Sequence, residues 1–286
     1  MISPLEGEPV KLISCKTALS KSGLYDIDYA LNPYKGCAHG CLYCYAPDII
    51  KCEGCGEWGS WVEARANISR VLKKEIQKIG DAMIGLATVT DPYQPAEERL
   101  GITRACLEII SHSDASLMLM TKSPLALRDF DILGKIKKLE FCVTVTTLDE
   151  ILARQMEPNA PTPKARLDLL REAARSGFRT SAMISPWLVS TDNPQEELSE
   201  MIGMFAQAGC RNITIDRLRM RPTAIKRVAG IASMQKQSAR IRSVVERSEN
   251  IDAGDILERI SARKLFPDIS FEIPSFDRMS TVQRNL

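Results

Sequence analysis

Short apolar runs alternate with longer amphipathic stretches along most of this chain. The runs cover residues 83–90, 116–121, 141–147, 178–184 and 212–215. Between the runs, apolar residues recur three and four positions apart, which is typical of helices that bury one face. Nearly continuous apolar strands that are joined by helices predict a parallel β-sheet covered by helices.

One further strand is expected within residues 25–32, so the pattern amounts to about six βα units, fewer than the eight of a closed barrel. Residues 1–24 are predicted to form an N-terminal segment, residues 25–220 the α/β core and residues 221–286 a helical C-terminal extension. Polar or proline-containing loops follow the core strands, for example Thr90-Asp91-Pro92 and Thr121-Lys122-Ser123. Because α/β folds place their chemistry at the carboxyl ends of parallel strands, we expect the site there.

The overall charge excludes a polycation that coats nucleic acid or anionic lipid. The 286 residues hold 38 Lys and Arg against 36 Asp and Glu, a formal net charge of +2. One local exception is the stretch 217–247, in which Glu246 is the single acid among many basic residues. This basic stretch is either a contact surface for a phosphate backbone or a solvated helix face.

The chain shows no membrane or secretion signal. It has no apolar stretch of the roughly 18 residues that a spanning helix needs. Its first residues lack the basic and apolar regions of a signal peptide. We therefore expect a cytoplasmic protein without a membrane partner.

The cysteines are the most informative residues in the composition. Five of the nine lie within residues 37–55, and such clustering in a reducing compartment indicates metal or cluster ligation rather than disulfides. With His39 and His112 as the only histidines, a multi-histidine metal site is excluded. The spacing Cys37-x3-Cys41-x2-Cys44 suits three irons of an iron–sulfur cube, which leaves the fourth iron open. The amino and carboxylate groups of S-adenosylmethionine (SAM) are suited to that open iron.

Zinc is the main rival interpretation. Cys41-x2-Cys44 and Cys52-x2-Cys55 together have a four-thiolate spacing that a zinc knuckle can use. That interpretation predicts a zinc-stabilised nucleic-acid-binding module, and it leaves Cys37 unexplained. A second alternative is a non-catalytic iron–sulfur protein without SAM turnover. Cys52 and Cys55 are taken as an exposed loop, as ligands of a second metal or as redox thiols.

Several motifs carry a resemblance to a known family. They are Asn32-Pro33-Tyr34-x-Gly36-Cys37-x3-Cys41-x-Tyr43-Cys44-Tyr45-Ala46, Trp58-Gly59-x-Trp61-Val62-Glu63, Thr90-Asp91-Pro92-Tyr93-Gln94-Pro95, Thr121-Lys122-Ser123 and Glu157-Pro158-x-Ala160-Pro161. With them the chain resembles the radical SAM superfamily, in its spore photoproduct lyase-like branch, which is also described as DNA repair photolyase-like. The resemblance implies a partial (β/α)6 barrel of the TIM type, and reductive cleavage of SAM to a 5'-deoxyadenosyl radical that abstracts hydrogen from a substrate.

The resemblance also implies roles for individual residues. Cys37, Cys41 and Cys44 would hold a [4Fe-4S] cluster, and Tyr45 would lie near the adenine of SAM. Three strand-end residues would contact SAM through hydroxyl or ammonium groups, namely Thr90, Lys122 and Thr146. A reductant such as flavodoxin or ferredoxin would supply the electron.

The substrate is the least determined part. Photoproduct lyases carry a hydrogen-donating cysteine shortly before the end of the second strand, where this chain has Thr88. A lyase reaction on a DNA lesion is therefore in doubt. Nucleic acid stays a candidate substrate, and modification of RNA, a peptide or a small molecule is equally compatible with the residues. The candidate substrate contacts are Asp91, Tyr93, Gln94, Arg217 and Arg219.

Overall fold

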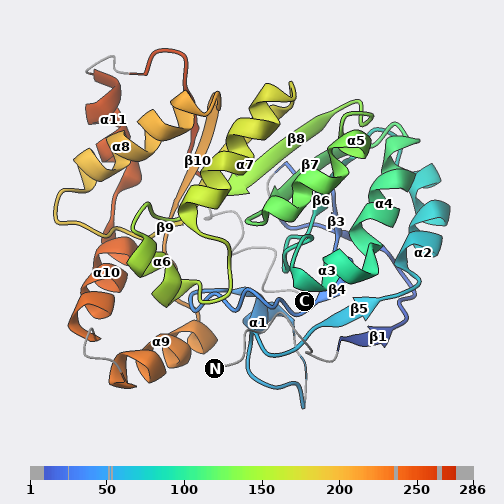
Figure 1. Cartoon of the computed structure of the whole chain (residues 1–286), viewed down its shortest axis with the longest axis horizontal. Coiled ribbons are helices and arrows are strands. Elements are labelled where there is room, and N and C mark those ends of the chain that lie inside the picture. The colour runs from blue at the N-terminus through green and yellow to red at the C-terminus, as the bar shows by residue number, and fades with distance from the viewer. Residues whose placement is uncertain are drawn as a thin grey trace. The chain divides into compact units, whose positions relative to one another are not determined.

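The computed structural model of the chain describes residues 10–24, 26–50, 52, 54–234, 238–262 and 266–274 (Figure 1). They divide into two compact units according to their internal contacts. The first unit holds the described residues up to His39, those of Cys52–Cys142, and Pro274. The second unit holds the described residues of Gly40–Lys51 and of Val143–Ile273.

The first unit contains a parallel sheet with an antiparallel edge and a smaller sheet. β6 (Met83–Leu86) lies between β3 (Tyr29–Leu31) and β7 (Ser116–Thr121), parallel to both, and β2 (Leu19–Lys21) pairs antiparallel with β3. The smaller sheet has the order β1-β5-β4, formed by Lys11–Ile13, Glu63–Arg65 and Tyr34–Lys35. The helical elements are α2 (Ile68–Glu75), η1 (Ile76–Lys78), α3 (Pro95–Leu100), α4 (Ile102–Ser111), η2 (Pro124–Asp129) and α5 (Phe130–Leu133). Helices α2 and α4 pack side by side (Figure 1).

The second unit repeats the strand–helix alternation. β10 (Asn212–Arg217) lies between β9 (Arg179–Trp187) and β11 (Ser270–Glu272), parallel to both, and Ile213 is opposite Ala182 and Phe271. Its helices are α1 (Ala46–Ile49), α6 (Glu150–Met156), α7 (Pro163–Arg175), α8 (Pro194–Gln207), α9 (Pro222–Met234), α10 (Ser238–Asn250) and α11 (Ala253–Ala262). Strand β8 (Leu139–Thr144) begins in the first unit and ends in the second.

Local sequence signals explain where the helices of the second unit begin. The side chain of Thr162 accepts a hydrogen bond from the backbone of Ala165, and Asp149 accepts two from the first turn of α6. Both residues are favoured caps because they bind backbone N–H groups that a helix leaves without partners at its start. Proline follows the capping residue in α7 and α8, where its missing N–H is not needed.

The predicted fold class is confirmed. The strand order over the described residues is β11-β10-β9-β8-β7-β6-β3-β2, which is open at both ends and mostly parallel, as a partial barrel requires. Several strand boundaries differ from the prediction; for example, β8 covers Leu139–Thr144 instead of 141–147, and β10 continues to Arg217. Strand β6 ends at Leu86 because Ala87 adopts a left-handed φ of 65° that no strand can contain, and β9 continues to Trp187. The predicted domain boundaries after residues 24 and 220 stay predictions. No helix of the described part is long and apolar enough to cross a bilayer.

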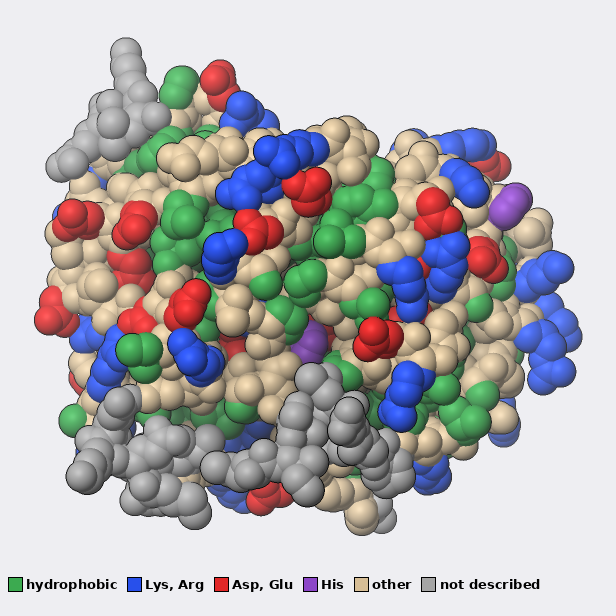
Figure 2. Space-filling model, viewed as in Figure 1, with side chains coloured by type: hydrophobic (Ala, Val, Ile, Leu, Met, Phe, Trp, Pro, Cys, Tyr) green, Lys and Arg blue, Asp and Glu red, His purple; other side chains and the backbone are tan. Residues whose placement is uncertain are grey.

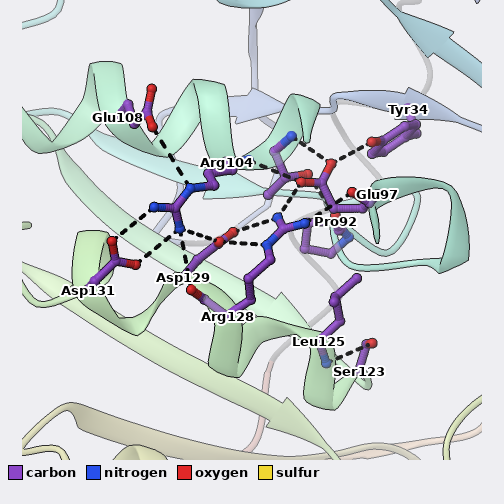
Figure 3. Close-up of polar contacts among 11 residues, drawn as sticks. Tyr34, Pro92, Glu97, Arg104, Glu108, Ser123, Leu125, Arg128, Asp129 and Asp131 are labelled. Carbon is purple, nitrogen blue, oxygen red and sulfur yellow. Dashed lines mark hydrogen bonds and ion pairs between the residues drawn. The ribbon is translucent and has the colours of Figure 1, made fainter. Parts of the chain in front are cut away.

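A network of charged side chains lies beside the sheet of the first unit (Figure 3). The carboxylates of Glu97 and Asp129 are fully buried. Arg128 bridges them, with 2.7 Å to Glu97 and 2.8 Å to Asp129, and Arg104 adds a 2.7 Å contact to Asp129. Glu97 also accepts a hydrogen bond from the phenol of Tyr34. A buried carboxylate without a partner destabilises the folded state strongly. Loss of either arginine is therefore expected to lower the stability of this unit.

We predict that Arg128→Met lowers the free energy of unfolding by about 3 kcal/mol, because it leaves two buried carboxylates short of their cationic partner. Urea denaturation of the purified protein measures the change. Lys137→Met is the control, since the Lys137–Asp114 pair is about 70% exposed on both sides and such pairs contribute less than about 1 kcal/mol. Equal effects of the two substitutions would contradict the prediction.

Candidate functional site

The three cysteines of the Cys37-x3-Cys41-x2-Cys44 motif lie in a loop without helix or strand, which we call the cysteine loop (residues 36–45). Cys37 and Cys41 are buried, Cys44 is half-buried, and none of the three is in a disulfide. A four-iron cluster takes one thiolate per iron, so its ligands need not converge on a single point. The donor set therefore fits a cluster with three protein ligands. Residues 36–39 belong to the first unit and residues 40–45 to the second.

In the first unit, the backbone on both sides of Cys37 is held by two side chains that follow β6. Thr90 donates a hydrogen bond to the carbonyl of Gly36 at 2.6 Å. Gln94, which is fully buried, accepts from the backbone N–H of Ala38 at 2.9 Å and donates to Thr90 at 3.0 Å. The predicted SAM contact Thr90 and the predicted substrate contact Gln94 thus support the cysteine loop.

Glycine is required at the start of this loop. Gly36 has a φ of 83°, and a Cβ atom there would lie 2.5 Å from the carbonyl oxygen of Trp61. Any other residue would be strained by the backbone conformation and would collide with Trp61.

Asp91 is a buried junction of the first unit. Its Oδ1 accepts hydrogen bonds from the hydroxyl of Thr121 at 2.8 Å and the backbone of Tyr93 at 2.9 Å, and its Oδ2 accepts from the backbone of Lys122 at 2.8 Å. The ring nitrogen Nδ1 of His39, in the cysteine loop, lies 3.5 Å from Oδ2. Asp91 therefore joins the ends of β6 and β7 beside the loop, and Tyr93 is buried with it.

In the second unit, the cysteine loop is held by a buried carboxylate. Glu157 accepts hydrogen bonds from the phenol of Tyr43 and from the hydroxyl of Thr146, and Arg166 forms an ion pair with its other oxygen. All four side chains are buried. Burial and the neighbouring Glu157 charge raise the pKa of Tyr43 well above its usual value, so the phenol stays protonated and donates.

The remaining predicted residues are dispersed. Tyr45 is 41% exposed, directly before α1, and Lys122 is half-buried after β7. Arg219 pairs with the carboxylate of Asp216 at 2.6 Å, and Arg217 is exposed and donates to the carbonyl of Glu249 at 3.5 Å.

Cys52 and Cys55 form a disulfide with 5.5 Å between their Cα atoms. In this state neither sulfur is a thiolate, so the four-thiolate zinc knuckle is not formed. A site in which three or more His, Cys, Asp or Glu side chains surround one metal ion is not found among the described residues. The role of Cys52 and Cys55 in binding a second metal remains a prediction for their reduced form.

The sequence did not indicate the residues that hold the loop through Glu157. Glu157 itself lies in the Glu157-Pro158 motif, but no role was assigned to it. Arg166 carried a usable signal, because Leu169 and Leu170, three and four residues further on, place it on an apolar helix face. A cation at such a position is expected to have a buried anionic partner.

Curated relatives are similar to more than half of the chain. An uncharacterized protein of Methanocaldococcus jannaschii is 33% identical over 174 residues, which are 61% of this chain and 66% of that protein. An uncharacterized protein of Mycobacterium tuberculosis is 28% identical over 220 residues, 73% of this chain and 65% of that protein. The chain thus spans just under two thirds of the length of these relatives.

Solved structures share the fold. A spore photoproduct lyase complexed with a dinucleoside spore photoproduct superposes with a TM-score of 0.66 at 14% identity, over 92% of this chain and 82% of that chain. SuiB of Streptococcus suis, bound to SAM, gives a TM-score of 0.58 at 12% identity, over 91% of this chain and 54% of that chain. At these identities the likeness concerns the fold alone.

A family model decides the assignment. The model of the radical SAM superfamily matches residues 31–204, a range that includes the cysteine loop and the loops after β6 and β7. The cofactors of this family are a [4Fe-4S] cluster and SAM. The match covers more than half of the chain, which therefore belongs to the radical SAM superfamily.

Proposed function

We propose that the protein reductively cleaves SAM and that the resulting 5'-deoxyadenosyl radical abstracts hydrogen from a substrate. The observation that carries this proposal is the cysteine loop, in which three cysteines outside any disulfide lie on a mostly buried segment that side chains hold in each unit. When bound, the [4Fe-4S] cluster delivers an electron to the sulfonium of SAM, which yields methionine and a 5'-deoxyadenosyl radical. A flavodoxin or ferredoxin is the proposed electron donor.

The chain's own residues bind and orient these groups. We assign Cys37, Cys41 and Cys44 as cluster ligands. Tyr45 is exposed directly after Cys44, which suits contact with the adenine, and the ammonium of Lys122 suits the methionyl carboxylate as a charge-assisted hydrogen bond. The hydroxyls of Thr90 and Thr146 already donate within the protein. Each hydroxyl has two acceptor lone pairs, so a contact with SAM remains part of the proposal.

Nucleic acid is the proposed substrate class. The spore photoproduct lyase with the same fold holds a dinucleoside lesion, whereas SuiB has also been solved with a precursor peptide. Part of the basic stretch is neutralised internally, because Arg219, Arg240 and Arg247 pair with aspartates. Among the residues of this stretch whose side chains the structure describes, the exposed cations are Arg217, Arg221, Lys226 and Arg242. On the face seen in Figure 2, many Lys and Arg lie next to Asp and Glu, whereas a group of basic side chains at the right edge has no acidic ones among it.

The proposed reaction on this substrate is similar to that of a lyase, but it differs in its hydrogen donor. The hydroxyl of Thr88, at the position where photoproduct lyases carry their donor cysteine, accepts a hydrogen bond from Asn32 at 3.4 Å. A hydroxyl is a much poorer hydrogen-atom donor than a thiol. The enzyme is therefore proposed to act on a nucleic-acid substrate whose conversion needs no thiol at this position.

We predict that Cys41→Ala abolishes both the cluster and SAM cleavage, because the cube loses one of three protein ligands. The measurements are iron and acid-labile sulfide after anaerobic reconstitution, followed by 5'-deoxyadenosine formation with SAM and dithionite. Cys15→Ala is the control, since Cys15 is a half-buried free thiol outside the loop. About four irons per wild-type chain without any nucleoside product would instead identify a non-catalytic iron–sulfur protein.

We predict that Gln94→Glu releases cluster iron to a chelator about tenfold faster than the wild type, as expected when a buried hydrogen bond of about 1.4 kcal/mol is removed. A carboxylate accepts from the backbone of Ala38 but cannot donate to Thr90. Gln77→Glu makes the same change at an exposed position and should leave the rate unchanged. A wild-type rate in Gln94→Glu contradicts the supporting role of Gln94.

We predict that replacing Arg221 and Lys226 by Gln weakens binding of a single-stranded DNA oligonucleotide. The slope of log affinity against log salt should fall by about 0.7 for each phosphate that the protein no longer neutralises. Fluorescence anisotropy across a salt series measures this slope. Replacement of Lys73 and Lys74, which are exposed in α2, by Gln is the control. An unchanged slope excludes the basic stretch as the nucleic-acid binding surface.

A further inference from the structure

We propose that Arg227 is a positioning residue that holds the ligand loop of the cluster and places a permanent positive charge beside it. The inference rests on the proposed function, because it takes Cys41 as a cluster ligand. Arg227 belongs to α9, and all of its contacts discussed below lie within the second unit.

The guanidinium of Arg227 binds three successive carbonyls of the cysteine loop. Its NH2 group donates to Gly40 at 2.6 Å, and its NH1 group donates to Cys41 at 2.7 Å and to Leu42 at 3.4 Å. The loop has no helix or sheet to satisfy these carbonyls, and a buried carbonyl without a partner destabilises the fold. Only the fork of an arginine offers several donors in a fixed geometry, since the ammonium of a lysine is a single point.

Helix α9 is anchored to the loop on both sides of this contact. Val228, the next residue, packs in a buried cluster with Cys41, Leu42 and Tyr43. At the start of α9, the hydroxyl and the backbone N–H of Thr223 donate to Asp48 in α1 at 2.9 and 3.3 Å. Helix α1 directly follows the cysteine loop in the chain. Helix α9 is therefore held both to the loop and to α1.

This contribution comes from outside the part of the chain that the family shares. The family model ends at residue 204, whereas α9 spans Pro222–Met234. The basic stretch that suggested a nucleic-acid surface therefore has a second use, because one of its arginines supports the cluster loop instead.

The charge has an electrostatic consequence. The reduction potential of an iron–sulfur cluster depends on the net charge and the hydrogen bonds around it. The guanidinium carries its positive charge at every physiological pH. A positive charge beside a ligand favours the reduced state of the cluster, which is the more negative one. Arg227 is therefore expected to raise the potential of the cluster and to make its reduction easier.

The test compares the wild-type protein with Arg227→Met, Arg227→Lys and the control Arg175→Met, an exposed arginine of α7 in the same unit. After anaerobic reconstitution without SAM, two quantities are measured: the rate of iron release to a chelator, and the midpoint potential from a titration followed by electron paramagnetic resonance. Arg227→Met removes the donor of all three hydrogen bonds. Because the loss of even one charged hydrogen bond corresponds to roughly a tenfold change, iron release should be at least about tenfold faster, and the potential should be lower. Arg227→Lys should also release iron faster but keep the wild-type potential, because it preserves the charge and removes the fork.

The outcomes separate the inference from the proposed function. A purely structural role would change iron release equally in the Met and Lys variants and leave both potentials at the wild-type value, which overturns the electrostatic part of the inference. Wild-type iron release and potential in Arg227→Met overturn the inference as a whole. A wild-type protein that binds no four-iron cluster overturns the proposed function and this inference with it. If the Met variant does not fold, the Lys variant alone decides, since unchanged iron release in it overturns the role of the fork.

Discussion

Unsatisfied backbone groups in the cysteine loop are the constraint on which the described site depends. The loop is mostly buried but has neither helix nor sheet, so its N–H and carbonyl groups need other partners. Side chains supply many of them, through Thr90 and Gln94 in the first unit and Arg227 in the second. Thr90 and Gln94, which the sequence suggests as contacts of SAM and of the substrate, therefore form hydrogen bonds with the backbone of this loop. The protein's own side chains thus hold the backbone of the ligand loop.

Buried carboxylates fix the elements around this loop in both units. Glu97 is paired with Arg128 in the first unit, and Glu157 with Arg166 in the second. Such pairs add little net stability compared with apolar packing, but removal of one partner leaves an uncompensated charge in the interior. Each carboxylate also accepts a hydrogen bond from a tyrosine phenol in or near the cysteine loop: Glu97 from Tyr34, and Glu157 from Tyr43. The polar interior thus specifies one arrangement of the loop rather than merely stabilising the fold.

The family region and the C-terminal helices contribute different parts of the site. Residues 31–204 carry the thiols and the strand-end loops, which is the part that radical SAM proteins have in common. Helices α9–α11 lie beyond that region, and α9 reaches back to the ligand loop. Folds of this kind keep one chemistry and vary the substrate through their added segments. Through Arg227, the C-terminal helices contact the loop that carries the proposed cluster ligands.

The sequence by itself determined the fold class and the identity of the thiol ligands proposed for the cluster. The apolar runs at 116–121 and 212–215 and the spacing of Cys37, Cys41 and Cys44 are local properties, so they are readable without a partner. Tertiary structure alone decided what the polar side chains bind. Thr90 meets a carbonyl 54 residues away, and Arg227 meets one 187 residues away. A sequence states that a side chain is able to donate hydrogen bonds, but only the folded chain brings a particular acceptor within reach.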